Sequence, residues 1–412
     1  MDTKVGADSR AAPPATVRSR VESEVRTWFA DRPALDAPLL TAGVLLVAAS
    51  AFVLVRLAVA AHGDISTFAQ AGAQFTDPAR APHGLAVRSG SGYDGQFYYR
   101  LALQPWNLSW SAHGITFDFG FRRQRVGYSW LAWTLSGGQA AAAPYALVAV
   151  NLLGLGALGF FTGKWAQSLG RHALWGLLPA GYFGLVWSLS RDLTEITAIT
   201  LVVAGIVAWR SRHPLWSGLA FAGAVLSRET ALLVVAALAV TRMADVVRRK
   251  ERLGRADLGW AIPAAVFVGW QATCAVAFGG TPLFSEGMNA SAPFTGSIRS
   301  VLGWIEHPGL THLLLLTQLV VLVVVAGLAF WNLRRSRSSP FERLAFVFSV
   351  ILLALLSTSI WNKDPREFRT MVDVFVLGSG VLLGTRTFRP FLLTAATWVV
   401  WLMVAALSAK YL

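Results

Sequence analysis

Residues 39–61 read LLTAGVLLVAASAFVLVRLAVAA, and only Thr41, Ser50 and Arg56 interrupt this apolar run with polar side chains. A helix needs about 20 apolar residues to cross the hydrocarbon core of a bilayer, so the run is long enough to span it. Further runs of similar character lie at residues 258–278, 313–331 and 391–407. The sequence therefore predicts a protein that crosses a membrane several times.

Composition leads to the same class of protein. The 412 residues are 55% hydrophobic and only 14% charged, whereas about 25% of an average soluble domain is charged. A soluble chain of this length would need a charged surface, and lipid is the simplest replacement for it. The first apolar run begins near residue 38, which is too late and too long for the apolar part of a cleaved signal peptide.

Apolar segments alternate with polar connections along most of the chain, which predicts an all-α bundle of about 11 membrane-spanning helices. We expect residues 1–37 to form a cytoplasmic tail and residues 38–412 a single membrane domain. The expected spans are residues 38–61, 143–166, 172–190, 193–209, 214–226, 229–242, 257–279, 309–333, 342–361, 370–386 and 390–408.

The net charge of +14 is distributed unevenly between the connections. Lysine and arginine predominate in every second connection, whereas the alternate ones mix acidic and basic residues. The basic connections are residues 163–172, 210–213, 242–256, 334–343 and 386–389. Because basic connections remain on the cytoplasmic side, this alternation predicts a cytoplasmic N-terminus and an outer C-terminus. The positive charge thus needs no nucleic-acid partner to explain it.

The longest connection, residues 62–142, falls on the outer side in this topology. It contains Trp106, Trp110, Trp130 and Trp133, and such aromatic residues are uncommon in disordered segments. We expect a folded loop with short helices at the membrane surface and aromatic side chains at headgroup depth.

The loop contains YDGQFYYR at residues 93–100, its densest group of polar side chains. A carboxylate, an amide, three phenols and a guanidinium occur there, and a helix would place the amide and the guanidinium on one face. Its candidate site residues are Asp94, as a catalytic carboxylate, with Tyr93, Gln96, Tyr99 and Arg100 as ligand-binding side chains. Asp94 also fits the N-cap of a helix that begins after it.

A second acid, Asp64, follows the first span almost directly. It fits either a catalytic carboxylate held at headgroup depth or the N-cap of a short interfacial helix. Later in the loop, Arg122, Arg123 and Arg125 oppose the local charge bias. They fit contacts with membrane phosphates, or a site for a phosphate or diphosphate ligand, which arginine binds in bidentate fashion.

Further charged residues map to the outer ends of predicted spans. They are Arg191, Asp192 and Glu195, then Arg228 and Glu229, and finally Arg366, Glu367, Arg369 and Asp373. Ionisable groups at membrane depth are costly unless they are paired or line a wet cavity, so structural ion pairs and a common ligand site both fit. The sequence lacks a P-loop, a dinucleotide glycine fingerprint, an HExxH motif and a CxxC pair.

This pattern resembles the GT-C superfamily of membrane glycosyltransferases. The resemblance rests on YDGQFYYRLA at residues 93–102, RRQR at 122–125, LSRET at 226–230 and REFR at 366–369. It implies a bacterial plasma-membrane enzyme that takes a sugar from a polyprenyl-phosphate donor and needs no cofactor. The sequence shows no cluster of metal-ligating residues, which argues against a metal. The acceptor would be a cell-envelope glycan or glycolipid, and the sugar would be transferred with inversion at its anomeric carbon.

The resemblance also implies roles for individual residues. A carboxylate of the first outer loop would act as general base on an acceptor hydroxyl, and both Asp94 and Asp64 match that position. Cations would hold the departing lipid phosphate, a role that Arg122, Arg123, Arg125 and Arg369 fit. The chain lacks the adjacent acidic pair that parts of the superfamily carry, so the choice of base stays open between the two aspartates.

Two other classes of function fit the same architecture. A flippase or transporter of a lipid-linked saccharide precursor would commonly show internal repeats and charges near the bilayer midplane, whereas the charges here map to helix ends. A non-catalytic membrane scaffold would tolerate alanine at all of the acidic positions.

Overall fold

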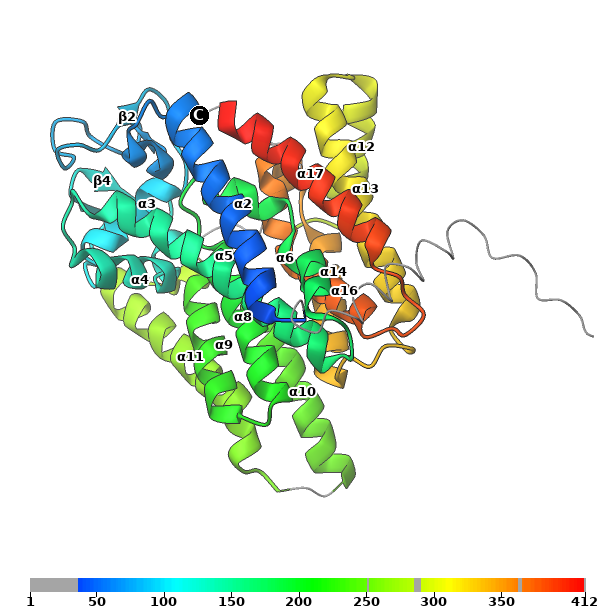
Figure 1. Ribbon diagram of the computed structural model, residues 1–412. Coiled ribbons are helices and arrows are strands. Elements are labelled where there is room, and N and C mark those ends of the chain that lie inside the picture. Colours follow the sequence, from blue (N-terminus) through cyan, green and yellow to red (C-terminus); the bar gives the residue numbers. More distant parts are fainter. Residues whose placement is uncertain (1–35, 250–251, 285–289, 362–364, 411–412) are drawn as a thin grey trace, which may run out of the picture.

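The chain folds as an all-α, multi-pass membrane protein (Figure 1). The computed structural model describes residues 36–249, 252–284, 290–361 and 365–410. Within these ranges, six helical segments are long and apolar enough to cross a bilayer. They are Pro38–Val59 (α2), Ala143–Ser168 (α5), Glu229–Arg248 (η5 with most of α10, Leu232–Arg249), Arg255–Ala277 (η6 with most of α11, Leu258–Phe278), Leu310–Asn332 (α13) and Phe391–Ala409 (most of α17, Phe391–Lys410).

The other expected spans form shorter helices. Residues 172–190 are divided into η4 (Ala173–Gly176), α6 (Leu177–Ala180) and α7 (Gly184–Leu189). The remaining helices after α5 are α8 (Glu195–Arg210), α9 (Pro214–Ser227), η7 (Pro282–Phe284), α12 (Thr295–Glu306), α14 (Pro340–Leu355), α15 (Thr358–Trp361), η8 (Pro365–Met371) and α16 (Val372–Leu383). Every residue of α7 and of α16 is buried, so these short helices form the inner core of the bundle.

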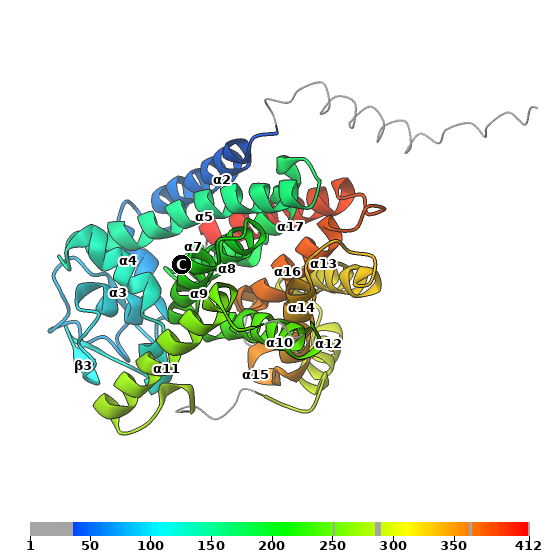
Figure 2. The same ribbon diagram turned by 90° about the horizontal axis from the view of Figure 1, so that it is seen from below.

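Close helix packing depends on small residues, as is common in membranes. Gly159 of α5 faces the backbone of α2, where a Cβ atom would lie only 2.8 Å from the Ala42 Cα atom. Figure 2 shows α16 beside α13 and α14, with α10 next to α14, and these helices are in contact. The site described below lies at one end of this group.

The segment between α2 and α5 is folded and lies at one end of the bundle (Figure 1). It contains η2 (Ile65–Ala69), α3 (Gly95–Leu103), η3 (Gly120–Gln124) and α4 (Gly127–Ser136). Its strands form two small pairs: Ala71–Gly72 (β1) runs parallel to Val87–Arg88 (β2), and Ser111–Ala112 (β3) runs antiparallel to Ile115–Thr116 (β4).

Short helices were expected in this segment, but α3 differs from the surface helix that the sequence predicted. All of its residues are buried, because its aromatic side chains pack inside the segment. Phe97, for example, contacts the rings of Phe75 and Phe117. Trp106 and Trp110, in contrast, are more than half exposed, at 58% and 52%.

Candidate functional site

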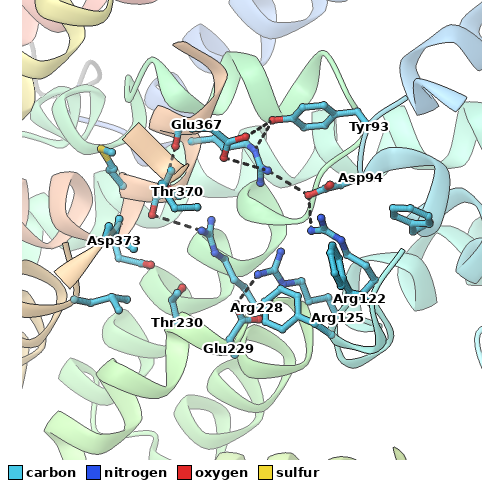
Figure 3. Close-up of a pocket in the computed structure, with 18 of the residues that line it drawn as sticks. Tyr93, Asp94, Arg122, Arg125, Arg228, Glu229, Thr230, Glu367, Thr370 and Asp373 are labelled. Carbon is cyan, nitrogen blue, oxygen red and sulfur yellow. Dashed lines mark hydrogen bonds and ion pairs between the residues drawn. The ribbon is translucent and has the colours of Figure 1, made fainter. Parts of the chain in front are cut away.

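A cavity of about 670 Å³ opens where the folded segment meets the ends of the helices (Figure 3). Five carboxylates and four guanidinium groups line it: Asp94, Asp118, Glu229, Glu367 and Asp373, with Arg122, Arg125, Arg228 and Arg369. Aliphatic side chains also line it, chiefly Leu232 and Leu233 of α10, Leu352 and Leu353 of α14, and Leu356, and these leucines are called the aliphatic wall below. The cavity is therefore amphipathic.

Asp94 reaches the cavity from the residue before α3. Gly95 allows this approach, because a Cβ atom there would lie 2.8 Å from the carbonyl oxygen of Ala69 and even closer to that of Arg191. Asp94 occupies the N-cap position of α3, as the sequence suggested, but its side chain makes no capping hydrogen bond to the helix.

The Asp94 carboxylate binds two arginines instead. Its Oδ2 atom accepts hydrogen bonds from Arg122 at 2.8 Å and from Arg369 at 3.2 Å. Burial alone would raise the pKa of Asp94, but Arg122, Arg369 and Arg125 outweigh burial and lower it below the usual aspartate value. No residue in the described ranges donates a hydrogen bond to Oδ1, so one oxygen remains available to a ligand.

Arg369 is the centre of the charged network. It binds Glu195, and it lies 3.6 Å from the Glu367 carboxylate in addition to its contact with Asp94. Tyr93 accepts a hydrogen bond from Arg369 at 3.3 Å and donates one to Glu367 at 3.0 Å. One guanidinium thus joins the start of α3, the start of α8 and η8.

A second ion pair, between Arg125 and Glu229, lies in another part of the cavity lining. Arg125 contacts both oxygens of Glu229, at 2.9 Å through Nε and 2.6 Å through a terminal nitrogen. Such bidentate pairs fix geometry as well as charge. Arg228, the neighbour of Glu229, pairs with the fully buried Glu195 at 3.2 Å. The loop segment and the α9–α10 junction are therefore held together at the cavity.

The structure brings nine of the sequence candidates to the cavity lining. They are Tyr93, Asp94, Gln96, Arg122, Arg125, Arg228, Glu229, Glu367 and Arg369. Gln96 has a structural role as well, because its side-chain oxygen accepts hydrogen bonds from Gly72 and Thr76. Glu195 lies directly behind this lining through its pairs with Arg228 and Arg369.

The remaining candidates lie outside the lining. Asp64 is exposed and caps η2, accepting a hydrogen bond from the Ser66 amide at 2.9 Å. Tyr99 donates to the carbonyl of Ala140, and Arg100 to the carbonyls of Ser109 and Trp110. Four others, Arg123, Arg191, Asp192 and Arg366, are also absent from the lining.

Three of these arginine side chains lie against aromatic rings. Arg123 stacks on Trp110 at 3.7 Å, and Arg191 and Arg366 lie over the Tyr93 ring at 5.6 and 5.7 Å. The expectation that Arg123 faces a phosphate site together with its neighbours does not agree with this position. In a short 3-10 helix, consecutive side chains point in different directions, so only some of the RRQR stretch reaches the cavity.

Sequence reasoning missed the aliphatic wall and undervalued Asp118 and Asp373. Leucines that line a cavity have the same local pattern as leucines that face lipid, so the wall had no sequence signal. Asp373 was noted in the charged cluster with REFR but was not chosen as a site residue. Within the described ranges, no group of three or more His, Cys, Asp or Glu side chains is arranged to hold a metal ion.

Comparison with protein-family models, curated proteins and solved structures finds no match for this chain. The fold and the site define its class: a multi-pass, all-α membrane protein with a charged, partly aliphatic cavity at one end of the bundle.

Proposed function

We propose that the protein is an inverting glycosyltransferase of the bacterial plasma membrane, with a GT-C-like architecture and a polyprenyl-phosphate sugar as donor. The observation that carries this proposal is the cavity, whose lining combines the Asp94 carboxylate and four arginines with the aliphatic wall. A lipid phosphate has the same two-part character, an anionic head and an aliphatic chain. The acceptor is proposed to be a cell-envelope glycan or glycolipid.

The donor lipid fits the cavity in one orientation. Its chain packs on the leucines of α10 and α14, because burial of apolar surface favours that contact. Arg228 lies four residues before Leu232, where the charged and aliphatic walls meet, and so takes the phosphate. Arg122, Arg125 and Arg369 belong to the same lining, and we propose that they share its charge. Since each arginine already has a carboxylate partner, the phosphate must compete for these guanidinium groups.

Asp94 is the proposed general base, because of the two candidates for that role, Asp64 and Asp94, only Asp94 lines the cavity. Arg122 and Arg369 hold its Oδ2 atom, which orients the carboxylate and keeps it ionised. The acceptor oxygen forms a bond to the anomeric carbon while its proton passes to Oδ1. The bond from the anomeric carbon to the phosphate oxygen breaks, and its electron pair stays on the polyprenyl phosphate. Arginine side chains stabilise that developing charge.

The proposed topology has the N-terminus in the cytoplasm, the cavity outside and the C-terminus outside. This requires the shorter helices α8, α9, α14 and α16 and the α6–α7 region to count as crossings, which gives about eleven spans. The basic connections support it, since α10 runs from the cavity at Leu232 to a connection rich in arginine. An epitope tag at the N-terminus should be shielded in intact spheroplasts and a C-terminal tag accessible. Both tags accessible, or both shielded, would contradict this topology.

A transfer assay tests the chemistry. The purified protein in lipid nanodiscs should move a radiolabelled sugar from polyprenyl phosphate to a glycolipid or glycan acceptor, with inverted anomeric configuration in the product. Heat-inactivated protein provides the background. Flux of the lipid-linked sugar across proteoliposomes without any covalent transfer would instead favour a flippase.

A further inference from the structure

Asp373 is a buried carboxylate in the cavity that the proposed mechanism leaves without a role. It lies in the first turn of α16 and is 8% exposed. Figure 3 places it across the cavity from Asp94, beside Arg228, Thr230 and Thr370. Its backbone belongs to a helix that is buried along its whole length, so its position is well fixed.

Asp373 differs from the other four cavity carboxylates. Asp94, Asp118, Glu229 and Glu367 each form an ion pair with an arginine. Within the described ranges, Asp373 forms none. A carboxylate in the first turn of a helix gains from the helix dipole. That gain is small compared with the cost of burying a charge without a close partner. A ligand that donates hydrogen bonds would offset this cost.

Thr230 indicates which kind of hydrogen-bonding ligand group fits beside Asp373. Its hydroxyl is buried beside the Asp373 carboxylate and forms no hydrogen bond of good geometry with any group in the described ranges. The ionised Asp373 carboxylate accepts hydrogen bonds, whereas the Thr230 hydroxyl can donate one. A ligand hydroxyl can donate to the first and accept from the second. An ammonium group cannot accept, so this pair of side chains matches a hydroxyl better than an amine.

The position of Asp373 and Thr230 indicates that they contact the donor sugar of the proposed reaction. Thr230 lies between Arg228, the proposed phosphate ligand, and Leu232 of the aliphatic wall. A sugar attached to the lipid phosphate would lie close to this point, with its anomeric carbon toward Asp94. We propose that Asp373 and Thr230 recognise hydroxyl groups of the donor sugar and so determine donor specificity. This inference rests on the proposed function, because it takes the ligand to be a lipid-linked sugar.

Binding without turnover provides the test. The probes are a polyprenyl phosphate that carries a hexose and the same polyprenyl phosphate without sugar, each titrated against protein in nanodiscs. Wild-type protein should bind the hexose-bearing lipid more tightly, because the buried polar groups gain partners. Asp373→Asn and Thr230→Val should each reduce that preference at least tenfold, while affinity for the bare lipid phosphate changes less than threefold. Asp77→Asn, at an exposed loop aspartate, is the matched control.

Kinetics then separate recognition from a structural effect. In the transfer assay, both variants should raise the donor KM at least tenfold, with kcat within about threefold of wild type. An unchanged preference for the hexose in folded Thr230→Val protein would overturn the inference. The wild-type protein could also prefer the hexose-bearing lipid, lose that preference on Asp373→Asn, and yet show no transfer activity. That result would support the inference about sugar recognition and reject only the transferase proposal.

Discussion

Replacing Asp94 with asparagine should lower sugar transfer by roughly 100- to 10,000-fold, the usual range for loss of a general base. Asparagine has the same shape but cannot take the acceptor proton. The fold should tolerate the change, because Arg122 retains Asp118 and Arg369 retains Glu195. The measurement is kcat for transfer in nanodiscs, alongside the elution volume and melting temperature of the variant.

Asp64→Asn is the decisive comparison for this prediction. Asp64 has the same side chain and lies in the same folded segment, but it caps η2 outside the cavity. We expect its replacement to leave transfer within about threefold of wild type, since asparagine caps a helix about as well as aspartate does. If Asp94→Asn retains full activity, or if Asp64→Asn alone abolishes it, the assignment of the base is wrong.

The pH dependence of transfer follows from the same ion pairs. Arg122 and Arg369 help to lower the pKa of Asp94 below its usual value despite burial. The base therefore stays ionised as the pH falls from 8 to about 5, and it is lost only as the pH falls through this lowered pKa. Titration of Asp94 should accordingly leave kcat/KM flat over that interval.

Arg369→Ala should have the largest effect on stability, about 3–5 kcal/mol, the range for removing one partner from a buried ion pair. The guanidinium contacts Asp94, Glu195 and Glu367, and Glu195 is fully buried. Alanine would leave this carboxylate cluster short of positive charge at one end of the bundle. Tryptophan fluorescence can follow thermal unfolding, since the chain contains 17 tryptophans.

Arg80→Ala is the matched control for the stability measurement. Arg80 also pairs with an aspartate, Asp77, at 3.5 Å, but its side chain is 82% exposed. Water and salt screen such a pair, so its loss should leave the melting temperature unchanged. Equal melting temperatures for Arg369→Ala and Arg80→Ala would show that the Arg369 network does not stabilise the fold. Arg369→Lys should recover only part of the loss, because an ammonium cannot reach the same set of partners.

Local sequence was sufficient for the class of fold. A chain with 14% charged residues and several long apolar runs cannot cover itself with polar surface, and this constraint needs no knowledge of tertiary contacts. The lengths of the individual helices were harder to predict. Pro179 and Gly181 divide the 172–190 segment into short pieces, and α16 is short but buried on all sides. Apolar composition is the same for a helix inside the bundle and for one that faces lipid.

The candidate residues were also found from local sequence, because clustered polar side chains are conspicuous in an apolar chain. Which of them share one site depends on contacts between distant positions. Asp94 meets Arg369 across 275 positions of the chain, and Arg125 meets Glu229 across 104. Asp64 and Asp94 both remained candidates for the base on sequence alone, whereas in the fold Asp94 lines the cavity and Asp64 is exposed.

The sequence by itself thus determined that the protein is inserted in a membrane and that charged side chains lie at the ends of its helices. Only the tertiary structure decided which charges meet, which cavity carboxylate forms no ion pair within the described ranges, and which leucines line the cavity. The physical reason is the range of the interactions. Partition into lipid depends on the composition of each segment, whereas an ion pair depends on a separation of a few ångströms between residues that the fold alone brings together.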